Sequence, residues 1–220
     1  MDELTDLLSP KRLAKYQGIS KEDAFKCHLY NSELAESFYQ SLCYFEIILR
    51  NKIDLVFSKY LGKDWIFDTQ YHIGKNRNHY DDAIKRIERE KGVDYLKNRD
   101  CLISELTFGY WSFLFSSTYK DVLWNKYPTM LGEIFDGNKD SGKLSKMIYD
   151  INRIRLYRNK VFHYGSLLVV KDDYENPAHM YNITYNLMRS LGAKKIVKAI
   201  KEVDSFDFVY QKIKKLKILK

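Results

Sequence analysis

Apolar residues recur every three or four positions along most of this chain, which is the spacing of helices that bury one face. The longest such run extends from about Asn31 to Tyr60 and predicts one long amphipathic helix that ends at Gly62. No set of segments alternates apolar and polar residues as sheet strands do, and no sequence period repeats. The pattern therefore predicts an all-α fold, a bundle of helices.

Capping and breaking residues divide the rest of the chain. Ser9 as N-cap, Pro10 at the first helical position and Gly18 past the end delimit a short helix, and a second start follows at Ser20. Further helices are predicted over residues 77–91, 100–127, 143–163 and 179–203, with loops over 62–76 and 165–177. The second loop contains an apolar run at 167–170 that indicates a short extended piece.

Composition narrows the class of protein. A chain of 220 residues with 45% hydrophobic and 30% charged residues is expected to fold as one domain over residues 1–220. The three cysteines form no CxxC pair, so neither a disulfide framework nor a zinc site is predicted, and a reducing cytoplasm fits best. No run approaches the roughly 18 apolar residues of a spanning helix, and no secretory leader is recognised, so no membrane partner is expected.

Positive charge is concentrated in the basic C-terminal segment, residues 194–220. This segment holds nine lysines against three acids, which is +6 of the formal net charge of +8. Such a field attracts polyanions without selecting one, and RNA, DNA and acidic membrane surfaces all satisfy it. A lysine-rich helix can equally be a solvated face.

The stretch LYRNKVFHYG, residues 156–165, places an arginine and a histidine at the end of an apolar helix. The positions that share one stripe of this helix are Leu144, Met147, Ile151, Ile154, Arg158 and Val161. Arg158 is therefore predicted to face the core, where a guanidinium costs free energy unless it finds an anion or sits at an open edge of the stripe. Asn159 and His163 share a face, whereas Arg158 and His163 point about 140° apart on a regular helix.

An arginine and a histidine supply the minimum needed to cleave RNA without a metal ion. Arginine binds phosphate bidentately, and histidine transfers protons near neutral pH. Arg158 would hold the phosphate while His163 moves a proton at the ribose or the leaving oxygen, with Asn159 as an orienting group. The structural alternative is that Arg158 pairs with Glu46 or Glu105 in the core and His163 caps the helix C-terminus.

The tripeptide RNK occurs a second time, at Arg50, Asn51 and Lys52 within FEIILRNKIDLVF. Leu55 stands where the histidine would be, so this copy is not a second catalytic motif. Glu46 and Arg50 are spaced i, i+4 and are predicted to form a helical ion pair. This pair either faces the motif helix or is an ordinary surface pair.

Four stretches, in this order, resemble the Abi-like abortive-infection proteins (AbiD/AbiF type), a bacterial family within the HEPN superfamily. They are LSPKRLAKYQ, LCYFEIILRNKI, SELTFGYWSFLF and RLYRNKVFH, and the resemblance covers roughly residues 8–200. The resemblance implies an HEPN-like antiparallel helical bundle with additional helices, which dimerises and brings two R-x4-H motifs into one cleft.

The resemblance also implies a function and its residues. The expected activity is that of a metal-independent endoribonuclease that leaves 2′,3′-cyclic phosphate ends, in an abortive-infection, phage-defence or toxin–antitoxin setting. Arg158 and His163 would be the catalytic pair and Asn159 their polar partner. Three residues match the family's segment on the long helix and would bind the substrate: Glu46, Arg50 and Asn51.

Expected partners are RNA, a second copy of the chain and an RNA or protein antitoxin, without cofactor or metal. A non-catalytic RNA- or nucleotide-binding helical module is the alternative.

The chain departs from the family after the motif. Members commonly read R-N-R-x-x-H-H-E-P-I, whereas here Tyr164, Gly165 and Ser166 follow His163. Among the aromatic residues considered for stacking on a base, Tyr157, Tyr164 and Trp111, only Tyr164 is predicted to stack, and most of the aromatic residues near Trp111 are expected in the core. Gly109 within a helix indicates the close approach of a neighbouring element. No HExxH, P-loop, GxGxxG or GxSxG motif is present, which disfavours metal and nucleotide-cofactor enzymes.

Overall fold

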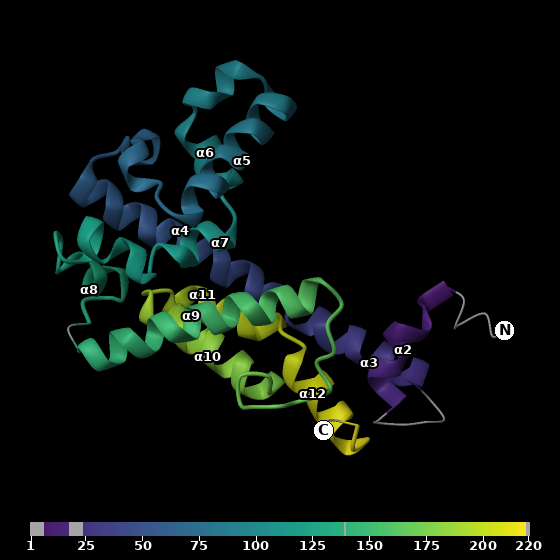
Figure 1. The fold of residues 1–220 in the computed structure, drawn as a ribbon. Coiled ribbons are helices and arrows are strands. Elements are labelled where there is room, and N and C mark those ends of the chain that lie inside the picture. Colours follow the sequence, from purple (N-terminus) through teal and green to yellow (C-terminus); the bar gives the residue numbers. More distant parts are fainter. Residues whose placement is uncertain (1–6, 18–23, 139, 219–220) are drawn as a thin grey trace. The chain divides into compact units, whose positions relative to one another are not determined.

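The computed structural model describes residues 7–17, 24–138 and 140–218, and every regular element within these ranges is a helix (Figure 1). The predicted all-α class is therefore confirmed. The longer helices are α2 (Pro10–Gln17), α3 (Ala24–Ser37), α4 (Tyr39–Leu61), α5 (Lys75–Lys91), α9 (Ser141–Phe162), α10 (Pro177–Ser190), α11 (Lys194–Val203) and α12 (Phe206–Lys215). The shorter ones are α6 (Arg99–Glu105), α7 (Phe108–Phe113) and α8 (Met130–Ile134). The remaining described elements are short. Four are 3₁₀ helices, η1 (Trp65–Phe67), η2 (Thr69–Tyr71), η3 (Val93–Lys97) and η4 (Ser117–Tyr119), and one is a π-helix, η5 (Lys120–Trp124).

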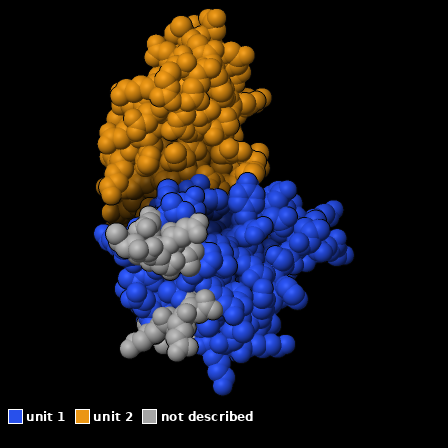
Figure 2. All heavy atoms as spheres, turned by 90° about the vertical axis from the view of Figure 1, so that its right-hand side faces the viewer, with its two compact units in different colours: residues 1–44, 156–186, 194–220 blue, residues 45–155, 187–193 orange. Residues whose placement is uncertain are grey.

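Contacts within the chain group its residues into two compact units, which Figure 2 colours separately. Unit 1 comprises residues 1–44, 156–186 and 194–220, and unit 2 comprises residues 45–155 and 187–193. Both units are assembled from stretches that are distant in sequence, and α4 and α9 each begin in one unit and end in the other. The prediction of one domain over residues 1–220 stays a prediction.

Unit 1 is built around an aromatic cluster. The ring of Phe38 lies 5.1 Å from that of Tyr157 and 5.0 Å from that of Phe206, between ring centroids. Phe206 stacks on Tyr181 at 4.0 Å. Each of these four side chains is almost fully buried, and such aromatic contacts add about 0.5–1.5 kcal/mol per pair beyond area burial. The cluster joins α9, α10 and α12 to the chain between α3 and α4, and α3 also packs against α2 and α12.

The prediction of one helix from Asn31 to Tyr60 is wrong, because the helix breaks at Phe38 into α3 and α4. The hydroxyl of Ser37 donates to the carbonyl oxygen of Leu34 at 2.7 Å, and that of Ser41 donates to the carbonyl oxygen of Phe38 at 3.0 Å. Serine hydroxyls that bond back to the preceding turn compete with the helical ladder. The apolar spacing continues across the break, so periodicity alone does not reveal it.

Unit 2 has its own core of tryptophan and phenylalanine rings. The ring of Trp65 lies 4.8 Å from Phe57 and 6.3 Å from Trp111, and all three are almost fully buried. Gly109 of α7 lies against the His79 ring of α5, and an added Cβ would come within 3.0 Å of that ring. The close approach predicted at Gly109 is therefore confirmed.

The predicted helical segment 100–127 is divided into α6, α7, η4 and η5. Two tryptophans bond to carbonyl oxygens near its breaks: the indole N–H of Trp111 donates to Leu106 at 3.2 Å, and that of Trp124 donates to Leu114 at 3.1 Å. These contacts stabilise the breaks, because a buried carbonyl needs a partner.

The C-terminal half also differs from the prediction. The helix expected over 179–203 is divided into α10 and α11 at Gly192, whose φ of 87° is the left-handed conformation that ends a helix. A separate α12 follows, and no strand forms at the apolar run 167–170. The helices predicted over 77–91 and 143–163 are confirmed as α5 and α9, and the short one after Ser9 as α2. The predicted helix end at Gly18 and start at Ser20 lie outside the described residues.

Candidate functional site

The candidate motif lies in unit 1, at the C-terminal end of α9. The buried positions of its last turns are Ile154, Tyr157 and Val161. Arg158 is only half-buried, so it does not take a fully buried position of the stripe, and its exposure agrees with the predicted alternative of an open edge. Tyr157 takes the core position, where its ring packs on Phe38. Burial of an aromatic ring is favourable, whereas a buried guanidinium would have to be desolvated.

Arg158 is oriented by an aromatic neighbour one turn further along α9. Its guanidinium carbon lies 4.7 Å from the ring centroid of Phe162, at i+4, which is a cation–π distance. The Phe162 ring in turn lies 5.9 Å from that of Tyr39, the first residue of α4. Arg158 and Tyr39 thus both contact the Phe162 ring.

His163 directly follows the last residue of α9, and its side chain is exposed. Its backbone N–H donates to the carbonyl oxygen of Asn159 at 2.9 Å, so the helical hydrogen-bonding pattern continues through His163. Asn159, half-buried, therefore shares a face with His163 as predicted. The same helical geometry directs Arg158 and His163 about 140° apart around the axis.

The residues after the motif form a tight helix cap. Tyr164 has a φ of 59°, and the N–H of Gly165 donates to the carbonyl oxygen of Lys160 at 2.7 Å, the pattern of a Schellman cap. A Cβ on Gly165 would lie 2.4 Å from Lys160 Cγ and 2.8 Å from the Lys160 carbonyl oxygen. The departure from the family at positions 164 and 165 thus has a local structural role.

Asn31 of α3 anchors the segment that follows the cap, a role that was not predicted from the sequence. Its side chain is buried; Nδ2 donates to the carbonyl oxygen of Gly165 at 3.1 Å, and Oδ1 accepts from the N–H of Leu167 at 2.6 Å. The available signal was a polar residue in register with Cys27 and Leu34, which are both buried on α3. A buried amide in an apolar stripe requires hydrogen-bond partners.

An open groove of about 570 Å³ lies beside the motif in unit 1. Its lining consists of Ala35, Glu36, Ser37, Tyr39, Gln40, Val161, Phe162, Tyr164, Val203 and Ser205. Tyr164, predicted to be available for stacking, is 66% exposed, whereas Tyr157 and Trp111 are buried. The guanidinium carbon of Arg12 lies 5.2 Å from the Tyr164 ring centroid. The described residues that line this groove do not include Arg158, Asn159 or His163.

The second RNK segment belongs to unit 2. Glu46 and Arg50 are half-buried and Asn51 is exposed, all on α4. Arg50 Nε donates to Asn51 Oδ1 at 3.2 Å. The ion pair of Glu46 with Arg50, and a common site of this segment with the motif in unit 1, stay predictions.

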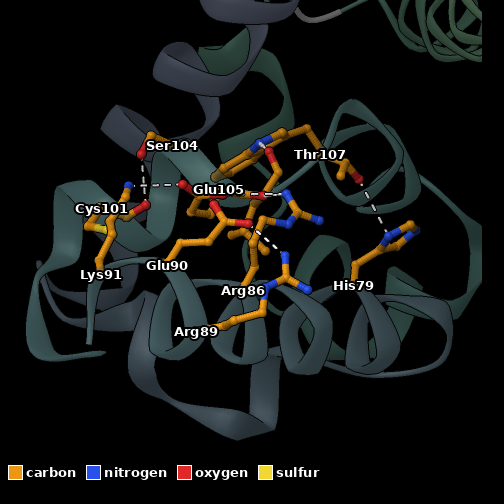
Figure 3. Close-up of polar contacts among 11 residues, drawn as sticks. His79, Arg86, Arg89, Glu90, Lys91, Cys101, Ser104, Glu105 and Thr107 are labelled. Carbon is orange, nitrogen blue, oxygen red and sulfur yellow. Dashed lines mark hydrogen bonds and ion pairs between the residues drawn. The ribbon is translucent and has the colours of Figure 1, made fainter. Parts of the chain in front are cut away.

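Glu105, one of the two acids considered as a partner of Arg158, bonds cations of its own unit (Figure 3). Its carboxylate accepts from Lys91 Nζ at 2.9 Å and lies 3.4 Å from an Arg86 guanidinium nitrogen. The hydrogen bond from Lys91 holds the pKa of the Glu105 carboxyl below its usual range. Lys91 Nζ also lies 3.4 Å from Cys101 Sγ. The negative charge of Glu105 is thus balanced between α5 and α6.

The basic C-terminal segment forms the exposed faces of α11 and α12. The exposed lysines of these helices are Lys194, Lys195, Lys198, Lys201, Lys212, Lys214 and Lys215. Two have specific contacts: Lys212 forms an ion pair with Glu33 at 2.8 Å, and Lys201 lies over the rings of Tyr181 and Tyr185. The others are available to a polyanion, as predicted for either a binding surface or a solvated face.

In the described residues, no three side chains of His, Cys, Asp or Glu are grouped as metal ligands would be. No helix in them has the length and apolar character needed to cross a membrane. Comparison of the chain with models of protein families, with curated proteins and with solved structures gave no match. The resemblance to the Abi-like family therefore rests on the four sequence stretches alone.

Proposed function

We propose that this chain is an HEPN-like antiparallel bundle with additional helices that acts as a metal-independent endoribonuclease of the R-x4-H type. Its setting would be abortive infection or a toxin–antitoxin pair, with an RNA or protein antitoxin as inhibitor. The observation that carries the proposal is the exposure of His163 at an anchored helix end, one residue beyond the ring that orients Arg158.

The chemistry follows from the two side chains. The Arg158 guanidinium binds the scissile phosphate and offsets the charge that develops in the transition state. His163 takes the proton from the ribose 2′-hydroxyl or donates one to the leaving 5′-oxygen. Attack of the 2′-oxygen on phosphorus breaks the bond to the 5′-oxygen and leaves a 2′,3′-cyclic phosphate. Asn159, on the face of His163, orients the imidazole or a phosphate oxygen.

A homodimer would resolve the divergence of Arg158 and His163. Side chains that point about 140° apart on one helix reach one phosphate more easily when two copies of the helix contribute. Each active centre would then combine groups from both subunits.

The test uses purified protein and 5′-labelled single-stranded RNA in excess EDTA. Cleavage with 2′,3′-cyclic phosphate ends is expected, and His163→Ala and Arg158→Ala should each reduce its rate by about 10²–10⁴-fold. Arg155→Ala is the matched control, because Arg155 lies on α9 and its guanidinium bonds locally to Asn152 at 2.9 Å. Intact RNA with the parent protein, or equal losses in Arg155→Ala, would contradict the proposal.

A non-catalytic RNA- or nucleotide-binding module of a defence system is the second candidate. It is favoured by the groove, whose lining includes Phe162 and Tyr164 but neither Arg158 nor His163. In the same assay, RNA that binds and stays intact would support this candidate.

A further inference from the structure

We propose that the groove of unit 1 binds an unpaired base of a single-stranded RNA, with Tyr39 as its stacking platform. This inference deepens the proposed function, because it places a base of the substrate beside the R-x4-H motif. It assigns a role to the start of α4, for which no role was predicted from the sequence.

Three large side chains that line the groove are more than half exposed. Tyr39 is 57% exposed, Tyr164 is 66% exposed and Val203 is 68% exposed, and all three line it. They come from three distant stretches of chain, which converge on one opening. Its volume of about 570 Å³ falls within the roughly 300–1,000 Å³ usual for ligand pockets.

The ring of Tyr39 is held in place for stacking. It lies 5.9 Å from the Phe162 ring at an interplanar angle of 51°, while Tyr39 stays more than half exposed. Tyr164 adopts a left-handed backbone conformation that costs a non-glycine residue about 1 kcal/mol or more. This strained conformation carries an exposed ring in the groove lining.

Charge next to these rings selects a nucleic acid over an apolar partner. The guanidinium of Arg12 lies over the Tyr164 ring and that of Arg158 lies over the Phe162 ring. Two cations therefore lie against the rings that line the groove. These guanidinium groups can bind the phosphates on either side of a bound base. Both rings belong to the segment that carries His163.

Polar groups in the groove suit the edge of a base. Gln40 offers an amide with both donor and acceptor atoms, Ser205 offers a hydroxyl and Glu36 an acceptor. Proteins that read single-stranded RNA combine such groups with aromatic platforms, because splayed bases expose both a face and an edge. In a duplex the faces of the bases are stacked and their Watson–Crick edges are paired, so neither is offered to this groove.

The experiment measures binding separately from cleavage. Full-length His163→Ala protein is titrated into fluorescein-labelled ten-nucleotide oligouridylate and oligoadenylate, and fluorescence anisotropy gives the Kd. Tyr39→Leu in the same background should raise Kd by about 5- to 150-fold, which corresponds to about 1–3 kcal/mol for one stacked base. A duplex of the same length should compete weakly.

Tyr44→Leu is the matched control, since Tyr44 is on the same helix, is 44% exposed and does not line the groove. It should leave Kd unchanged. Circular dichroism establishes that each variant retains its helices.

The outcomes separate this inference from the nuclease proposal. Binding that depends on Tyr39, without cleavage by the parent protein, supports the groove and overturns the nuclease. Cleavage with Kd unchanged in Tyr39→Leu supports the nuclease and overturns the groove. If Tyr39→Leu alters the oligomeric state in sedimentation and leaves RNA binding unchanged, the groove is a subunit interface and the inference is overturned. Absence of oligonucleotide binding overturns it as well.

Discussion

The side-chain amide of Asn31 bonds to the backbone on both sides of Ser166, donating to Gly165 and accepting from Leu167. These contacts join α3 to the segment that follows the motif, across more than 130 positions of sequence. Because α9 ends at Phe162, the position of His163 depends on its own helical hydrogen bond, on the cap and on this clamp.

Asn31→Leu should therefore destabilise the protein. The apolar side chain fits the stripe but leaves the Gly165 carbonyl and the Leu167 N–H without partners, which costs about 1–3 kcal/mol. Urea unfolding followed by circular dichroism measures the change. Ser32→Ala is the control, because the exposed Ser32 hydroxyl bonds only locally, to His28. Equal stability of Asn31→Leu and the parent would show that the clamp contributes nothing.

Gly165→Ala should also be destabilising. Its Cβ would meet the Lys160 carbonyl oxygen at 2.8 Å, so the cap must open or the backbone must shift, at about 1–3 kcal/mol. In a chain of this size, each kcal/mol lowers Tm by about 2–4 °C. Gly142→Ala, in the first turn of the same helix, has its nearest contact at 3.4 Å and should be neutral or slightly stabilising. A thermal scan in which both variants melt alike would refute the assigned role of Gly165.

His72 in unit 2 should make stability depend on acid pH. Burial lowers the pKa of its imidazole to about 4 from 6.5, while Nε2 bonds to the Ile66 carbonyl oxygen and Nδ1 to the Tyr110 hydroxyl. The folded state therefore favours neutral His72. Its contribution is full above pH 6.5 and is lost as the pH falls through 4, up to about 3 kcal/mol.

The measurement is the urea midpoint at pH 7, 5 and 4 for the parent protein and His72→Gln. Carboxylates titrate in both proteins, so the difference between their pH slopes isolates His72. His72→Gln should be less stable at pH 7 and should lose less stability on acidification. Parallel slopes would be inconsistent with a neutral buried imidazole.

Arg158→Lys tests whether the proposed phosphate contact needs a guanidinium. Lysine keeps the charge but loses the planar fork that binds two phosphate oxygens and stacks on Phe162. RNA cleavage should fall by at least about tenfold, since one bidentate charged contact is worth more than about 1.4 kcal/mol. Initial rates under single-turnover conditions measure the effect. Full activity of Arg158→Lys would mean that charge alone suffices.

Periodicity predicted the class of fold and the course of α5 and α9 because each buries one face. It did not distinguish Tyr157 from Arg158 as the fully buried position, since the two are neighbours and both fit a spacing of three or four. It also missed the break at Phe38, where the hydroxyls of Ser37 and Ser41 bond to the preceding turns while the apolar spacing continues.

The candidate site was predictable only in part. The guanidinium, amide and imidazole groups of the RNKVFH segment can be read from the residue types, so Arg158, Asn159 and His163 could be named from the sequence. The clamp by Asn31 and the groove at Tyr39 could not, because they depend on contacts between stretches far apart in the chain. The local pattern of apolar and polar residues contains no information on such long-range contacts.

The assembly of unit 1 from distant stretches has a consequence during synthesis. Phe38 packs on Phe206 of α12 as well as on Tyr157 of α9, so a ribosome must make α12 before the aromatic cluster of unit 1 is complete. Domains made from a continuous stretch can fold while translation proceeds, whereas this one must wait for its latest helix. A nascent chain therefore completes this aromatic cluster only late in translation.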